Sequence, residues 1–143
     1  MKKKLRPAWL RGLMLVAGLG LCLYIRVDIV EYARMEALGV FSPEEWPGII
    51  AGQRFLWTIR GFWAATFFYQ FATWNWDRKK KYPMLGDGIF VTVLAFLWAC
   101  LHWGIVPMNG GMRAMWLIML AVLACCAAHQ WRGYWKLEKT NKS

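Results

Sequence analysis

The sequence predicts an all-α membrane protein, a single polytopic domain over residues 1–143 that crosses the bilayer four times. First, 59% of the residues are hydrophobic, whereas soluble domains hold roughly 45–50%. Second, the apolar residues form blocks close to the roughly 20 residues that a helical span needs. Third, the charged residues lie between these blocks and alternate in sign. We place the spans at about 8–28, 55–76, 86–106 and 112–131.

The alternating charge predicts the orientation of the chain. The connection after the first block is acidic, whereas the N-terminus, the connection after the second block and the tail are basic. The basic residues are Lys2, Lys3, Lys4, Arg6, Arg11, Arg78, Lys79, Lys80, Lys81, Arg132, Lys136, Lys139 and Lys142. Because basic segments stay in the cytoplasm, both termini are predicted to be cytoplasmic, N-in/C-in. This compact, positive-inside design favours the bacterial inner (plasma) membrane.

Between the first and second spans we expect a short acidic helical segment on the periplasmic side. Its apolar and acidic residues follow a helical pattern that ends near Gly39. Ser42 and Glu45 then have the spacing of a capping box, and Pro43 suits a first helical position. A helix from Pro43 is therefore expected to run into the second span. In the first span, Gly18 and Cys22 are small residues that predict the close approach of a neighbouring helix.

The second span contains two arginines, Arg54 and Arg60, which we place towards the acidic-side interface. A guanidinium near hydrocarbon needs a partner, and none of the spans offers a carboxylate at mid-depth. Arg60 is therefore expected to reach solvent, a lipid phosphate or a carboxylate of another chain. The acidic residues facing this end predict a surface for a partner or for lipid. They are Glu31, Glu36, Glu44 and Glu45.

A polar stripe, Thr66, Gln70 and Thr73, lies on one face of the second span because the three residues follow helical spacing. A polar face on a membrane helix points to protein or water rather than lipid. We expect hydrogen bonds between helices, and the alternative is one wall of a polar path.

The third and fourth spans are expected to form a helical hairpin around a turn at 107–111. Asp87 is placed to act as an anion at the N-terminus of the third span. Trp98 and Trp116, and Trp63 of the second span, lie deeper or on the outer half and need packing partners for their indole N–H groups. A face of small residues on the fourth span favours close packing. It consists of Ala121, Cys125 and Ala128.

The histidines limit what a haem could use. His102 and His129 differ in depth by roughly 20 Å, since each residue adds 1.5 Å along a helix, so they cannot ligate one iron together. A haem on His102 would need its second ligand from a partner chain, and we expect His102 to hydrogen bond within the bundle instead. The cysteines fall in apolar runs without metal-binding spacing. We expect no cofactor and no bound metal.

The sequence contains no nucleophile elbow, phosphate-binding loop, dinucleotide fingerprint or zinc spacing, so we do not expect an enzyme. Its net charge of +10 is explained by orientation and anionic headgroups, and no nucleic-acid partner is predicted. The favoured function is a structural or accessory subunit of a larger inner-membrane assembly, such as secretion or conjugation machinery or a respiratory-type complex. Its partners would be the lipid bilayer and other membrane subunits or copies of itself. The alternatives are a small transporter or holin-like pore, and a membrane immunity or exclusion protein.

Overall fold

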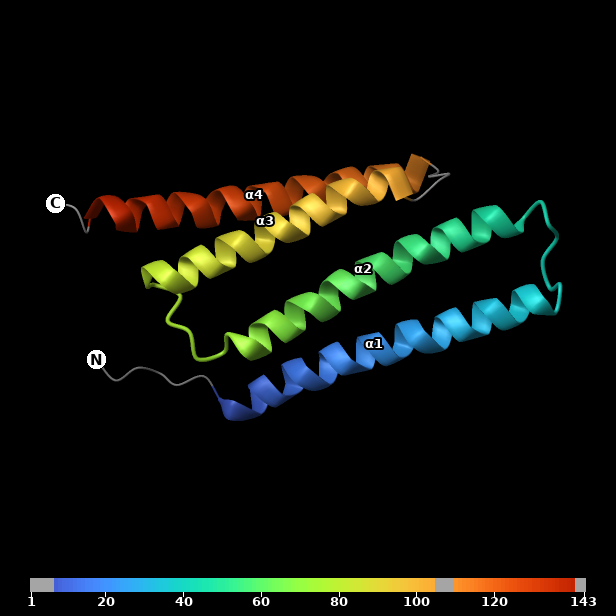
Figure 1. Cartoon of the computed structure of the whole chain (residues 1–143), viewed down its shortest axis with the longest axis horizontal. Helices are drawn as coiled ribbons and strands as arrows, with labels where there is room; N and C mark the ends of the chain where they lie inside the picture. The colour runs from blue at the N-terminus through green and yellow to red at the C-terminus, as the bar shows by residue number, and fades with distance from the viewer. Residues whose placement is uncertain (1–6, 105–109, 141–143) are drawn as a thin grey trace. The chain divides into compact units, whose positions relative to one another are not determined.

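The described part of the chain is mostly helical, and turns and loops join its helices. The computed structural model describes residues 7–104 and 110–140 and, within them, the side chains of all but residues 101–104. Its helices are α1 (Ala8–Ala37), α2 (Trp46–Ala72), α3 (Lys81–Gly104) and α4 (Gly110–Thr140) (Figure 1). These described ranges contain no strand. The all-α prediction is therefore confirmed.

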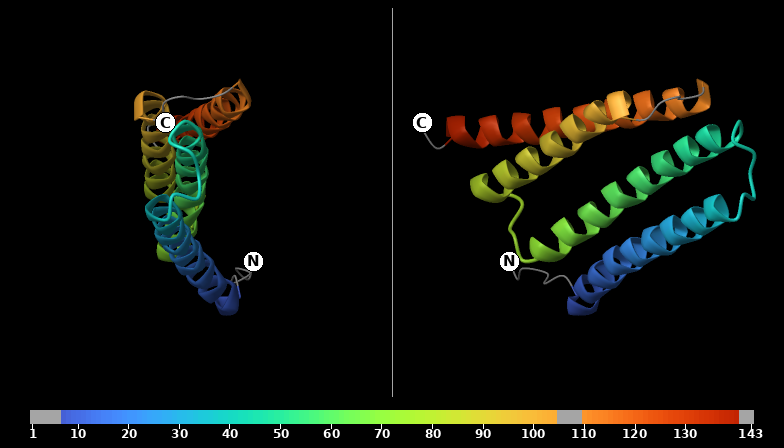
Figure 2. Two further views of the ribbon diagram at one scale, coloured as in Figure 1. Left: turned by 90° about the vertical axis from the view of Figure 1, so that its right-hand side faces the viewer. Right: turned by 45° about the vertical axis from the view of Figure 1, so that its right-hand side comes forward.

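The chain divides into two compact units, Met1–Asn75 and Trp76–Ser143. The first contains the pair α1 and α2, and the second contains the pair α3 and α4. Figure 2 shows the same two pairs of neighbours from other sides. Each unit is therefore a hairpin of two long helices.

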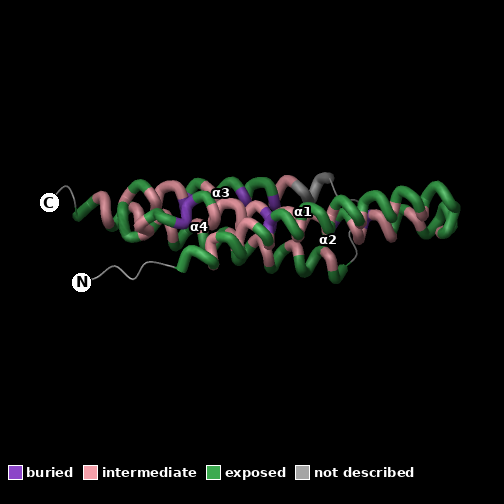
Figure 3. Tube along the Cα trace, turned by 90° about the horizontal axis from the view of Figure 1, so that it is seen from below, coloured by how far each residue is buried: buried purple, intermediate pink, exposed green. Residues whose placement is uncertain are grey.

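Three of the helices, α1, α3 and α4, are long and apolar enough to cross a membrane. Large apolar side chains on these helices are exposed, among them Leu19 and Leu23 on α1 and Ile118 on α4. Figure 3 shows exposed residues along most of the chain and few buried ones. In water such a surface would be unusual, whereas in a bilayer it faces lipid. The chain is thus a membrane protein with transmembrane helices.

The helices of the first unit are antiparallel and close together. Near the start of α1, the Arg11 Nε donates a hydrogen bond of 3.3 Å to the Phe71 carbonyl, near the end of α2. Within the hairpin, a Cβ added to Gly18 would lie 2.9 Å from a ring carbon of Phe68. The expected close approach at Gly18 is therefore confirmed. Cys22, in contrast, is exposed.

The first helix extends farther than its predicted span. It continues to Ala37, so the expected acidic segment is not a separate helix but the last turns of α1. The chain then turns at Gly39, whose positive φ of 63° suits glycine. The predicted capping box is present: the Ser42 Oγ accepts from the Glu45 N–H at 3.2 Å, and the Glu45 Oε2 accepts from the Ser42 hydroxyl at 2.9 Å. Helix α2 itself begins at Trp46, not at Pro43.

The second unit is also an antiparallel hairpin, because residues at the start of α3 contact the end of α4. A Cβ added to Gly133 would lie 2.6 Å from the Met84 Sδ, and Gly88 lies against the Trp131 ring. Helix α4 continues to Thr140, so the basic tail is helical beyond the predicted span end at 131. The predicted small-residue face of α4, by contrast, is exposed and is not used against α3. Of the predicted turn, residues 107–109 lie outside the described residues.

Candidate functional site

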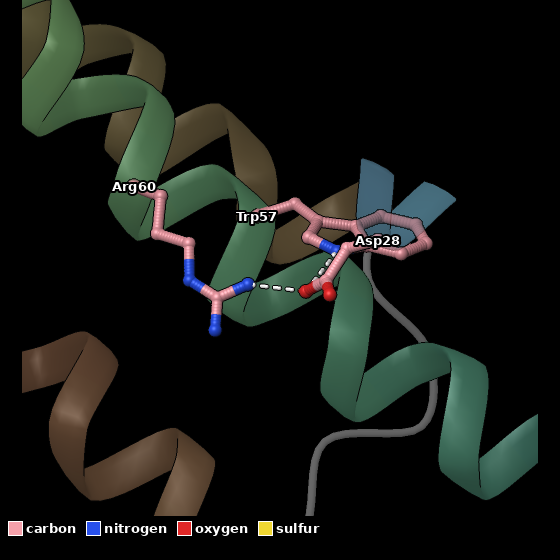
Figure 4. A network of polar contacts seen from close by, with 3 residues as sticks. All are labelled: Asp28, Trp57 and Arg60. Carbon is pink, nitrogen blue, oxygen red and sulfur yellow. Dashed lines mark hydrogen bonds and ion pairs between the residues drawn. The ribbon is translucent and has the colours of Figure 1, made fainter. Parts of the chain in front are cut away.

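The best-defined polar site joins the middle of α2 to α1. The Arg60 Nη1 lies 2.6 Å from the Asp28 Oδ2, which makes a hydrogen-bonded ion pair. The same carboxylate oxygen accepts a hydrogen bond of 3.4 Å from the Trp57 indole. Figure 4 shows the guanidinium and the indole converging on Asp28 from α2. One carboxylate therefore receives two donors that lie about one turn apart on the facing helix.

The ion pair is partly buried. The side chains of Arg60 and Asp28 are 24% and 22% exposed. The Arg60 guanidinium carbon also lies 4.5 Å from the centre of the Tyr24 ring, a cation–π contact that covers one face of the charge. Together, Tyr24, Asp28, Trp57 and Arg60 make a compact cluster, which we call the Arg60 cluster.

The expectation that Arg60 lacks a carboxylate within its own chain is wrong. The expectation considers only carboxylates at mid-depth, whereas Asp28 is the last residue of the predicted first span. In the structure α1 remains helical through Asp28 to Ala37, so the carboxylate has a fixed place opposite Arg60. The charge of Arg60 is therefore neutralised within the hairpin, and not by lipid, solvent or another chain.

The predicted contact surface at this end is nearly balanced in charge. Exposed residues here include Arg54, which forms no ion pair among the described residues. Counting the ends of α1 and α2 that meet here, five carboxylates stand against four guanidinium groups, a net charge of −1. The carboxylates are Asp28, Glu31, Glu36, Glu44 and Glu45, and the arginines are Arg26, Arg34, Arg54 and Arg60.

These glutamates have different roles. Glu45 is held by the capping box with Ser42. Glu31, Glu36 and Glu44 are exposed, and none of them forms an ion pair within the described part of the chain. Therefore three of the five carboxylates, those of Glu31, Glu36 and Glu44, are available to bind a partner outside the chain.

The polar stripe on α2 is largely occupied by its own helix. The Thr66 hydroxyl donates to the Phe62 carbonyl at 2.9 Å, and the Thr73 hydroxyl donates to the Tyr69 carbonyl at 2.7 Å. Thr73, the C-cap residue that follows the end of α2 at Ala72, is buried, and Gln70 is half-buried between the two threonines. Each of these bonds runs to the carbonyl four positions earlier and uses the hydroxyl proton within the helix.

The second unit has its own buried ion pair. Asp87 is 4% exposed and pairs with Arg78 from the connection before α3. Because α3 begins at Lys81, Asp87 lies in the second turn of the helix and not at its N-terminus, where the dipole acts most strongly. The sequence placed Asp87 correctly near the basic connection but not against Arg78.

Tryptophans hold α3 and α4 together through polar contacts. The Trp98 indole donates to the Trp116 carbonyl at 2.9 Å, and the Trp116 indole donates to the Trp98 carbonyl at 3.0 Å. Trp98 has no exposed surface at all. The expectation of a partner is confirmed for these two indoles, and each residue provides the partner of the other. The Trp63 ring, in contrast, is exposed. Nearer the basic end, the Trp131 indole donates to the Thr92 hydroxyl at 3.0 Å.

The residues considered for a haem do not form a ligand set that the structure describes. The side chain of His102 lies outside the described residues, and His129 is exposed on α4. Among the side chains that are described, no group of three or more histidine, cysteine, aspartate or glutamate residues is placed to hold a metal ion. No family model, curated protein or solved structure matches this chain.

Proposed function

We propose that this chain is a non-catalytic structural or accessory subunit of a larger inner-membrane assembly. The observation that supports this proposal is that the polar side chains between the helices pair with other groups of the same chain. Arg60 pairs with Asp28, Arg78 pairs with Asp87, and the two tryptophans of α3 and α4 bond to each other. The first and third of these contacts join the two helices of a hairpin, and the second fixes the connection before α3 to that helix. Such contacts suit a packing role better than chemistry on a substrate.

We further propose that α2 is a fourth span and that both termini are cytoplasmic. At 1.5 Å per residue, the 27 residues of α2 extend about 40 Å, which exceeds the roughly 30 Å of bilayer hydrocarbon. The charge of Arg60 is neutralised by Asp28, and the Thr66 and Thr73 hydroxyls bond to backbone carbonyls. Because α2 runs antiparallel to α1, it would return the chain to the side from which α1 started.

The contacts of the polar stripe favour a subunit over a pore. A pore would need the stripe to face water, whereas Thr73 is buried and Thr66 and Gln70 are half-buried. A cysteine substituted at Thr66, Gln70 or Thr73 should therefore resist a membrane-impermeant thiol reagent. The experiment needs a background without Cys22, Cys100, Cys125 and Cys126. Cysteine at the exposed Glu44 is the matched position that should react, and labelling of the stripe at a similar rate would favour the pore.

Native mass measurement tests the subunit proposal directly. The full chain is extracted from its own membrane in mild detergent and its mass is measured without denaturation. We expect a complex heavier than the 16.7 kDa of one chain. A stable monomer would contradict the proposal.

Reporter fusions test the topology. A reporter placed after Ser143 should be active only in a form that requires the cytoplasm, and one placed after Phe41 only in a form that requires the periplasm. A periplasmic signal after Ser143 would overturn the count of four spans.

A further inference from the structure

The end of α4 carries a stripe of exposed basic and aromatic residues. In the last turns of the helix the exposed positions are Arg132, Trp135, Lys136, Lys139 and Thr140. The first four of these follow i, i+3, i+4, i+7 spacing and therefore lie on one face. Trp135 is 56% exposed. We call Arg132, Trp135, Lys136 and Lys139 the basic stripe.

Contacts on the opposite side of α4 show that the basic stripe faces away from α3. Lys81 of α3 lies 3.7 Å from the Glu138 carboxylate and 5.4 Å from the centre of the Tyr134 ring. Gly133 and Trp131 also pack against α3, through Met84 and Gly88. Since these residues bind α4 to its partner helix, Arg132, Trp135 and Lys136 of the basic stripe remain available to the surroundings.

The basic stripe continues an apolar face of the same helix. Going back along α4 at the same spacing, the exposed residues are Ile118, Ala121, Val122, Cys125 and Ala128. The 31 residues of α4 extend about 46 Å, whereas hydrocarbon accounts for roughly 30 Å. The last turns of α4 therefore reach the headgroup layer, and the face changes from apolar to basic where hydrocarbon gives way to headgroups.

The charges of the basic stripe suit a phosphodiester. The Arg132 guanidinium and the Lys136 ammonium lie one turn apart, and neither forms an ion pair with a described residue. A guanidinium offers a planar fork of donors to phosphate oxygens, and an ammonium adds a point charge beside it. Trp135 between them has the amphipathic ring that favours the membrane interface.

We propose that the basic stripe binds the headgroup of an anionic phospholipid whose acyl chains lie along the apolar face between Ile118 and Ala128. A soluble acidic protein would use the charges but not the apolar face that continues from them. The proposal requires only that α4 crosses the membrane, and it is independent of the subunit proposal.

The test is lipid binding to the full chain in detergent, measured by native mass spectrometry. The probes are phosphatidylglycerol and phosphatidylcholine with identical acyl chains. We expect the wild type to retain phosphatidylglycerol in preference to phosphatidylcholine. Arg132→Gln combined with Lys136→Gln should raise the apparent Kd for phosphatidylglycerol about 30-fold, from the attraction of two basic residues near an anionic surface. Binding of phosphatidylcholine should change little.

The matched control is Arg26→Gln combined with Arg34→Gln, which removes two exposed arginines from α1 in the other unit. This control should bind phosphatidylglycerol as the wild type does, and so should the charge-conserving exchange Arg132→Lys with Lys136→Arg. The proposal is overturned if both lipids bind equally, or if the control loses as much affinity as the stripe variant. It is also overturned if free glycerol 3-phosphate competes as well as the lipid, because the acyl chains would then contribute nothing.

Discussion

Replacing Asp28 with asparagine removes the charge that neutralises Arg60 while keeping the shape of the side chain. Asparagine retains a carbonyl oxygen that can accept the Trp57 hydrogen bond, so the substitution isolates the loss of the ion pair. The guanidinium would remain beside the Tyr24 ring, three-quarters shielded, with a neutral group in place of its counter-ion. We expect the α1–α2 hairpin to become less stable.

The magnitude follows from the separation of the two groups and their exposure. At the 2.6 Å N–O separation and an effective dielectric constant of about 20, the attraction is roughly 6 kcal/mol before desolvation. Desolvation offsets most of it, and about a quarter of each side chain reaches solvent or headgroups. Breaking a fully buried pair costs about 3–5 kcal/mol. For this partly exposed pair we therefore expect Asp28→Asn to lower the free energy of unfolding by about 2 kcal/mol.

The assay is reversible unfolding of the full chain in mixed micelles, followed by far-ultraviolet circular dichroism as the fraction of denaturing detergent rises. Glu31→Gln is the matched control, because Glu31 lies one turn farther along α1, is exposed and forms no described ion pair. Its effect should stay within about 0.5 kcal/mol, as for other surface substitutions.

A double-mutant cycle separates the pair from its surroundings. Combining Asp28→Asn with Arg60→Gln should cost less than the sum of the two single changes, with a coupling of about 1–2 kcal/mol. Arg54→Gln serves as the exposed control on α2. If Asp28→Asn behaves like Glu31→Gln, or if the cycle is additive, the reasoning about the Arg60 cluster is refuted.

The other predictions concern packing and use the same unfolding assay. Gly18→Ala should destabilise the chain by about 1–2 kcal/mol because its Cβ meets the Phe68 ring at 2.9 Å. Gly20→Ala, where a Cβ meets nothing within 4 Å, should not, and equal effects would contradict the packing. Trp116→Phe should cost about 1 kcal/mol for the lost indole donor, whereas Trp63→Phe, on an exposed ring, should cost little; a larger loss at Trp63 would be the contrary result. Arg78→Gln should cost about 3 kcal/mol, since it leaves a buried carboxylate without this cation, and a neutral effect would show that other contacts suffice.

Local signals in the sequence predicted the elements well. The glycine at the turn after α1 and the capping box before α2 depend on residues at most a few positions apart, and both are present. Helix ends were predicted less well, because each predicted span stops where the apolar residues stop, at the expected membrane boundary. A helix has no physical reason to stop there. The tail after Trp131 contains arginine, lysine, leucine and glutamate, which favour helix, and α4 continues to Thr140.

The partners of side chains on the facing helix could not be predicted from local sequence signals. Sequence reasoning identified Arg60 as the charge that most needs a partner, but Asp28 lies 32 positions away, and only the register of α1 against α2 brings the two together. The same holds for the indoles of Trp98 and Trp116. Each was expected to need a partner, yet nothing local indicates that each bonds to the backbone of the other.

The Arg60 cluster also bears on why α2 is not among the helices apolar enough to cross a membrane. An average hydropathy counts both arginines of α2 as fully unfavourable, because it treats every residue as if it faced lipid without a partner. For Arg60 that cost is reduced by a carboxylate on the neighbouring helix and by an aromatic face. If α2 crosses the bilayer, as we propose, it does so as one half of a hairpin and not as an independent apolar segment. Stability and topology would then depend on the same ion pair, so Asp28→Asn should weaken insertion of α2 as well as its packing.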